Sequence, residues 1–230
     1  MGELVSFNGG DREFQGYLAE AANPGIGVIV IQEWWGLVDH IKEVCDRFAA
    51  EGITALAPDL YFGEATTEPT RAGELMMALN IAETAEVLKR AVTFLLDSPK
   101  VQAPKVGIVG FCMGGQLALY GASHDSRIGA CVHFYGIHPK VQPSYRDLAG
   151  PVLGFFAEHD EYNSPAVVKA LDEELTLLGK PHHFETYPGT KHAFFNDDRP
   201  EVYDEAAATD AWQKMLAFFQ ENLATQRATV

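Results

Sequence analysis

Continuous apolar runs alternate with amphipathic segments along most of the chain. Residues 27–31 form an unbroken apolar run, which is typical of a strand buried on both faces of a sheet. Across residues 38–50 the apolar side chains fall on one side of a helix, and Gly52 follows as a common helix-ending residue. The same patterns predict further strands at 53–57, 105–109, 128–135, 151–156 and 183–187. They predict further helices at 74–96, 113–122, 164–178 and 203–223, with a loop at 63–73.

The order of these elements predicts an α/β fold. Strands that alternate with helices indicate a mostly parallel central sheet with helices on both faces. Residues 3–20 differ, because they read as two short strands around the turn Asn8–Asp11. We find no repeat, low-complexity tract or linker, so we expect a single domain over residues 1–230. Ligands bind such sheets beyond the carboxyl ends of the strands. The polar or reactive residues at those positions are Glu33, Cys112, Tyr135, Asp160 and His192.

Composition narrows the class of protein and its partners. Hydrophobic residues make up 47% of the 230 residues, as in ordinary globular proteins, and no apolar run is long enough to span a membrane. The first residues lack the basic and apolar regions of a secretion signal, and three cysteines do not form a complete disulfide framework, so we expect a cytoplasmic protein. A net charge of −15 repels phosphate backbones, so we expect neither nucleic acid nor membrane partners. A monomer or a small homo-oligomer is expected.

The segment Gly110–Gly115 carries the strongest chemical signal. A predicted strand precedes it and a predicted helix follows it, which is the context of a G-x-nucleophile-x-G elbow. Cys112 takes the place of the more common serine. The turn would raise its thiol above the sheet at a helix N-terminus, where the helix dipole favours a thiolate. The backbone N–H of Met113 would then be an oxyanion donor. The alternative is that Cys112 is a small core residue at a tight turn.

Two further residues complete a possible triad. Asp160 follows the strand at 151–156 and His192 follows the strand at 183–187, so nucleophile, acid and histidine occur in the order that an elbow of this kind requires. His192 could accept the thiol proton and later protonate the leaving oxygen. Asp160 would fix the imidazole tautomer. Taken singly, Asp160 could be a loop-capping carboxylate and His192 a surface histidine; Glu158 and His159 fit the order less well.

Five segments together resemble the dienelactone hydrolase (carboxymethylenebutenolidase) family of the α/β-hydrolase superfamily. They are Gln32–Gly36, Ala57–Tyr61, Gly110–Gly115, Ala157–Asp160 and Lys191–Phe195. The resemblance implies the α/β-hydrolase fold, hydrolysis of a lactone or small ester, no cofactor or metal, and a triad of Cys112, His192 and Asp160. It also implies that Glu33 contacts the resting thiol and helps to create the thiolate when substrate arrives. The N–H of Trp34 would be the second oxyanion donor.

The sequence departs from the family at the expected substrate-binding positions. The family carries an arginine four residues after the catalytic histidine, where this chain has Asn196. A second family arginine lies near the start of the long helix, and Arg71 is the nearest candidate. Because a cation pairs strongly with a carboxylate, losing one arginine leaves open whether the substrate carries that group. Three aromatic residues could line the pocket, although core packing is the alternative for each of them: Trp35, Tyr135 and Phe195.

Two other functions fit the same residues. A non-catalytic module could keep the fold and bind a small acid, in which case no esterase activity is expected. An exposed thiol of low pKa at Cys112 could instead have a redox role, although no resolving cysteine lies nearby in the sequence. The complete set of triad residues favours the hydrolase.

Overall fold

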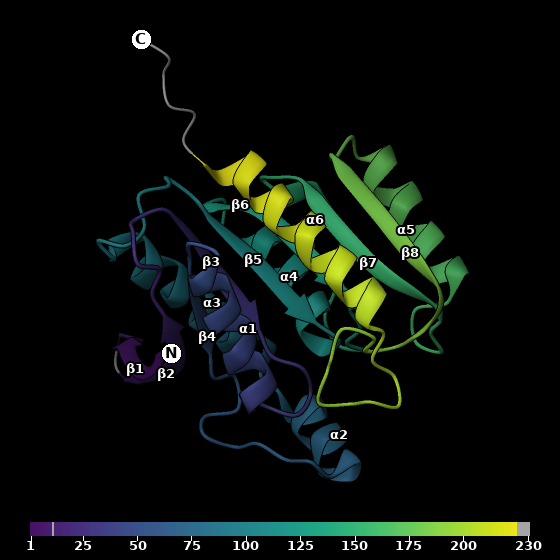
Figure 1. Ribbon diagram of the computed structural model, residues 1–230, viewed down its shortest axis with the longest axis horizontal. Helices are drawn as coiled ribbons and strands as arrows, with labels where there is room; N and C mark the ends of the chain where they lie inside the picture. Colours follow the sequence, from purple (N-terminus) through teal and green to yellow (C-terminus); the bar gives the residue numbers. More distant parts are fainter. Residues whose placement is uncertain (11, 225–230) are drawn as a thin grey trace.

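A computed structural model describes residues 1–10 and 12–224 and contains one eight-stranded sheet (Figure 1). The strand order is β1-β2-β4-β3-β5-β6-β7-β8. From β4 onward all neighbouring strands are parallel, whereas β1 pairs with β2 and β2 pairs with β4 in the antiparallel direction. The strands are β1 (Glu3–Asn8), β2 (Glu13–Ala19), β3 (Ile26–Ile31), β4 (Ile53–Pro58), β5 (Val106–Phe111), β6 (Ile128–Phe134), β7 (Val152–His159) and β8 (His182–Lys191).

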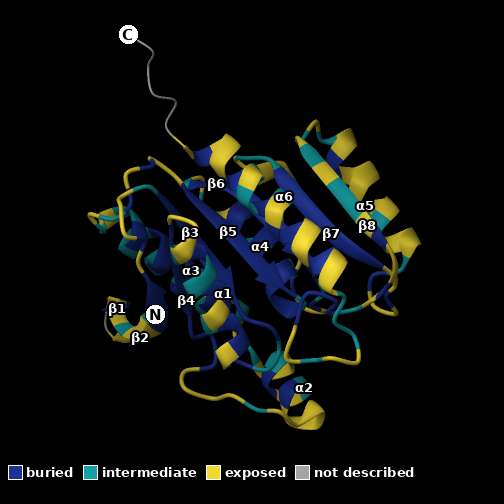
Figure 2. Ribbon diagram, in the orientation of Figure 1, coloured by how far each residue is buried: buried dark blue, intermediate teal, exposed yellow. Residues whose placement is uncertain are grey.

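The expected α/β fold class and the N-terminal hairpin are therefore confirmed. Every residue of β3, β4, β5 and β6 is buried, which explains why these strands read as continuous apolar runs rather than alternating patterns (Figure 2). The hairpin pairs Asn8 with Glu13, as its turn signal predicts. Asp11 of that turn, like residues 225–230 of the expected domain, lies outside the described residues.

Helices cover both faces of the sheet. On one face α1 and α6 contribute Phe48, Trp212 and Phe219 to a single apolar cluster. On the other face α3 and α4 contribute Val87, Leu88 and Leu117, among others. No helix in the described ranges has both the length and the apolar character needed to cross a bilayer. The helices are α1 (Asp39–Ala50), α2 (Pro69–Ala78), α3 (Ile81–Asp97), α4 (Met113–His124), α5 (Pro165–Leu177) and α6 (Glu205–Leu223).

The long helix predicted at 74–96 is wrong, because two helices occupy this region. Helix α2 begins at Pro69, inside the segment expected to be a loop, and α3 begins at Ile81. The backbone is extended at Leu79 and Asn80, and the Asn80 side chain accepts a hydrogen bond from the N–H of Glu83 at 3.2 Å. Asparagine is a favoured N-cap residue, so Asn80 starts a new helix instead of continuing the previous one.

Candidate active site

Cys112 occupies a sharp turn between β5 and α4. Its backbone angles are φ 53° and ψ −121°, a left-handed conformation that costs about 1–3 kcal/mol in a non-glycine residue and that is common at functional sites. The turn is possible because its flanking glycines lack side chains. A Cβ at Gly110 would overlap the carbonyl oxygen of Gly114, and one at Gly114 would overlap the carbonyls of Ile31 and Gln32. The predicted elbow is therefore present.

The turn is held by backbone hydrogen bonds on both sides of Cys112. Its N–H donates to the carbonyl of Phe134 at 3.1 Å, at the end of the neighbouring strand β6. Its carbonyl accepts from the N–H groups of Gly115, at 2.9 Å, and Ile137, at 3.1 Å. The Cys112 side chain is a free thiol and is only partly buried, so the strained backbone presents it at the sheet edge instead of sealing it in the core.

The structure brings His192 and Asp160 to the same edge. The Nδ1 atom of His192 lies 2.8 Å from Oδ2 of Asp160, whose side chain is fully buried. The other oxygen of Asp160 accepts from the backbone N–H groups of Tyr162, at 2.8 Å, and Asn163, at 3.0 Å. Two backbone donors and one imidazole thus fix the carboxylate, which in turn fixes the orientation of the histidine ring.

The charges around His192 favour its protonated form. Burial lowers the pKa of His192, but hydrogen bonds to Asp160 and Cys112, together with the negative charge on both groups, raise that pKa to about 10. Burial also raises the pKa of Asp160, yet the hydrogen bonds from His192 and from two backbone N–H groups outweigh it and leave that pKa below its ordinary value. The arrangement therefore lets His192 take and hold a proton from the thiol.

Because the pKa of His192 is raised on folding, its contribution to stability depends on pH. An unfolded histidine has a pKa of about 6.5, whereas the folded value is about 10. The stabilisation is fully present below pH ~6.5 and is lost as the pH rises towards ~10. We expect urea unfolding to show wild type losing stability over this range relative to His192→Gln. The exposed His183 is a control, since His183→Gln should follow wild type; a pH-independent difference for His192→Gln would contradict the prediction.

Glu33 lies in the same pocket and is nearly completely buried, at 1% exposed. Its Oε2 accepts a hydrogen bond from Nδ2 of Asn196 at 2.6 Å, while Oε1 has no partner among the described residues. Asn196 stands where the resemblance leads one to expect an arginine. Its amide is used to hold Glu33, so the hydrogen-bond donor to this carboxylate is a neutral group.

Two backbone N–H groups are available near the thiol. Those of Trp34 and Met113 donate to no protein acceptor in the turns, loops and caps of the described ranges. Met113 is the first residue of α4, so its N–H lies at the positive end of the helix dipole. Trp34 follows Glu33 in a turn and lines the pocket. Backbone N–H groups without a protein acceptor are the kind of donor that an oxyanion hole uses.

The pocket above Cys112 has a volume of about 750 Å³. Trp35 lines it, as predicted, but three other predicted substrate-binding residues do not. The positive φ of Tyr135 (37°) accompanies a buried ring that packs edge-on against His192, with centroids 5.0 Å apart. Phe195 stacks on Phe111 in the core at 5.1 Å. The pocket is lined by Glu33, Trp34, Trp35, Met76, Cys112, Ile137, Pro139, His159, Glu161, Tyr162, Lys191, His192, Ala193, Arg199 and Val202.

Arg71 is the third predicted residue that lies elsewhere. It is half exposed on α2, and its guanidinium pairs with Glu64 at 2.6 Å and with Glu74 at 3.0 Å. Arg199, which sequence reasoning missed, lines the pocket instead; its guanidinium pairs with Glu201 at 2.8 Å and lies 5.9 Å from the Trp35 ring. The signal that could have identified Arg199 is a positively charged residue shortly after His192. Arg199 lies three positions beyond Asn196, however, and belongs to no recognised motif.

Comparisons with known proteins identify the family to which the chain belongs. The profile of the dienelactone hydrolase family matches residues 14–223. "Protein usf" of Aquifex pyrophilus is 37% identical over 97% of this chain and 100% of its own, and the "Putative carboxymethylenebutenolidase" of Aquifex aeolicus is 34% identical with the same coverage. A crystal structure of a "Putative Dienelactone Hydrolase" from Klebsiella pneumoniae superposes with a TM-score of 0.87 at 29% identity, covering 96% of this chain and 98% of that one. The chain therefore belongs to the dienelactone hydrolase family.

Proposed function

We propose that this protein hydrolyses a lactone or small carboxylic ester through a thioester formed on Cys112. The observation that carries the proposal is the single chain of contacts from Asp160 through His192 to the thiol, which stands on a strained turn at the rim of a large pocket. A nucleophile, a base and a residue that orients the base are the three parts that such catalysis needs.

The reaction divides into acylation and deacylation. His192 takes the thiol proton as the sulfur of Cys112 attacks the carbonyl carbon, and the N–H groups of Trp34 and Met113 hold the oxyanion. The carbon–oxygen bond to the alcohol then breaks, and His192 returns the proton to that oxygen. Water, deprotonated by His192, attacks the thioester and releases the acid and the thiol. In a lactone the alcohol remains attached to the acyl group.

Arg199 is the residue that we propose recognises a carboxylate on the substrate. Asn196 is neutral and already donates to Glu33, whereas Arg199 lines the pocket beside Trp35. We expect Arg199→Gln to raise KM about tenfold for aryl esters and lactones that carry a carboxylate, and to leave neutral analogues unchanged. Steady-state assays on matched ester pairs measure this, with Arg146→Gln, outside the pocket, as control and Cys112→Ala as the inactive reference. Equal KM changes for both ester types would remove Arg199 from this role.

Glu33 is proposed to restrain the thiol until substrate arrives. Its buried carboxylate lines the same pocket as Cys112, and a negative charge beside sulfur disfavours the thiolate. We expect Glu33→Gln to speed alkylation of Cys112 by iodoacetamide at pH 7 about threefold to tenfold. Mass spectrometry of the modified cysteine over a pH series measures the rate. Glu161→Gln, at the exposed wall of the pocket, is the matched control, and an unchanged or slower rate in Glu33→Gln would contradict the proposal.

A further inference from the structure

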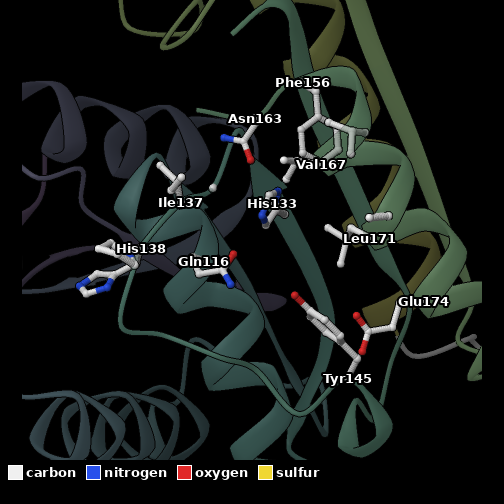
Figure 3. A pocket seen from close by; sticks show the side chains of 14 residues that line it. Gln116, His133, Ile137, His138, Tyr145, Phe156, Asn163, Val167, Leu171 and Glu174 are labelled. Carbon is white, nitrogen blue, oxygen red and sulfur yellow. The ribbon is translucent and has the colours of Figure 1, made fainter. Parts of the chain in front are cut away.

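A second cavity, of about 310 Å³, lies beside the active-site pocket (Figure 3). It is enclosed by the start of α4, the ends of β6 and β7, and the outward side of α5. Ile137 and Pro139 line both cavities, so the loop after β6 is a wall between them. The cavity contains none of the triad residues, and the proposed hydrolysis makes no use of it.

The feature that distinguishes this cavity is His133. Its side chain lines the cavity at 1% exposure, and neither ring nitrogen has a hydrogen-bond partner among the described residues. A buried polar group without a hydrogen-bond partner is destabilising, so native structures rarely retain one without a reason. Burial lowers the pKa of His133 to about 4, so the ring is neutral at pH 7 and offers one donor and one acceptor.

The rest of the lining is divided between polar and apolar sides. Figure 3 shows the polar ends of Gln116, Tyr145 and Asn163 facing the region around His133. On the α5 side the lining is apolar except for Glu174, with Val167 and Leu171 next to the ring of Phe156. An occupant that satisfies both sides needs a compact apolar body and a polar group directed at the imidazole.

The charges of the residues that line this cavity disfavour the binding of anions. Glu174 is the only acidic residue that lines the cavity, and no lysine or arginine lines it. The chain as a whole carries a net charge of −15. A carboxylate or phosphate in this cavity would meet Glu174 and a neutral imidazole without a compensating cation, whereas a hydroxyl group can donate to one ring nitrogen or accept from the other.

We propose that this cavity is a second small-molecule site, which takes a neutral ring-sized alcohol or phenol whose hydroxyl group hydrogen-bonds to His133. The site adjoins the loop that carries Asp160, because Asn163 belongs to both. The side-chain amide of Asn163 donates to the Tyr135 carbonyl at 2.9 Å, and its backbone N–H donates to Asp160. It shares only Ile137 and Pro139 with the pocket that holds Cys112 and contains none of the proposed catalytic residues, so the proposal does not depend on the proposed reaction.

Phenol is the probe that tests the proposal. In protein labelled with ¹⁵N-histidine, we expect phenol to shift the ring-nitrogen resonances of His133 saturably, with a Kd on the order of 1 mM for so small a ligand. The resonances are assigned by their loss in His133→Phe. Benzoate is expected to bind more weakly than phenol, because of Glu174 and the neutral imidazole.

Two tryptophan variants on one helix separate filling of the cavity from a general effect. Leu171→Trp places a large ring in the cavity and is expected to abolish the phenol-induced shift of His133. Leu177→Trp, at a side chain that is 85% exposed, is expected to leave it unchanged. Circular dichroism confirms folding, and because Leu171 is only partly buried the test stands even where His133→Phe fails to fold. A shift confined to His192, no saturable shift, tighter binding of benzoate, or normal binding in Leu171→Trp would each overturn the proposal.

Discussion

Replacing Cys112 with alanine is expected to abolish measurable turnover of a simple aryl ester while the fold remains. The sulfur is the only atom in the proposed mechanism that bonds to the acyl carbon, so its loss leaves the oxyanion donors and the histidine without a nucleophile to assist. Losses of about 10⁶-fold accompany removal of the nucleophile in comparable triads. Alanine can replace the side chain without new clashes because it is smaller, and circular dichroism checks that the strained turn survives.

Cys131 provides the matched control for this experiment. It is also a free cysteine, but it is buried on β6, where burial raises the pKa of its thiol, and it does not line the pocket. Cys131→Ala is therefore expected to keep turnover per folded molecule near that of wild type. Wild-type turnover in Cys112→Ala would refute the thioester mechanism, whereas no turnover in the wild type itself would favour the binding-module alternative.

Changing Asp160 to asparagine is expected to lower kcat about 10³-fold to 10⁴-fold, the scale seen for the same change in a Ser–His–Asp triad. The Asn oxygen can still accept from the backbone N–H groups of Tyr162 and Asn163, so the loop is retained. The amide nitrogen then faces Nδ1 of His192 and forces that atom to be an acceptor. The ring proton moves to the nitrogen that should receive the thiol proton, so the base is blocked while the fold is intact.

A second histidine–aspartate pair in the chain serves as control. Nε2 of His182 lies 3.1 Å from Oδ1 of Asp172, far from the pocket lining, and Asp172→Asn makes the same chemical change there. Its kcat is expected to match wild type. Steady-state assays over a pH series measure both variants, and a loss of less than tenfold in Asp160→Asn would mean that the carboxylate does not orient the base.

The positions of the proposed catalytic residues were predictable because they follow from the strand order of the fold. Parallel strands end at one edge, so residues that follow β5, β7 and β8 must meet there, whatever their distance in sequence. The glycines on either side of Cys112, Gly110 and Gly114, also indicate the tight turn. A side chain at either position would overlap a backbone carbonyl oxygen of Ile31, Gln32 or Gly114. Sequence reasoning therefore located Cys112, Asp160 and His192 before their contacts were known.

The substrate-binding residues were not predictable in the same way, because side-chain direction depends on local backbone angles and packing. Tyr135 follows a strand, like the catalytic residues, but its ring turns beneath His192 and supports it. Phe195 is adjacent to pocket residues in sequence, yet it faces Phe111 in the core. Arg71 forms ion pairs with two neighbouring glutamates on the protein surface. Arg199 lines the pocket from a loop that has no regular sequence pattern.

The division between α2 and α3 was readable in the sequence. Pro69 is suited to the first turn of a helix, where a missing N–H costs nothing, and Asn80 followed by Glu83 is a helix-start signal. The prediction followed the continuous apolar pattern from residue 74 onward instead of those signals. Apolar periodicity alone does not reveal a break of only two residues, here Leu79 and Asn80.

Helix α2 sits at the same end of the molecule as the loop that follows β8 and contributes Met76 to the pocket wall (Figure 1). It is anchored by only two buried residues, Ala72 and Leu75, and it supplies no member of the triad. Under the proposed function, this part of the pocket wall is therefore built separately from the reacting groups. Substitutions in residues 69–78 can therefore change the shape of the pocket entrance to fit larger or smaller acyl groups. Cys112, His192 and Asp160 lie on other elements and are not altered by such substitutions.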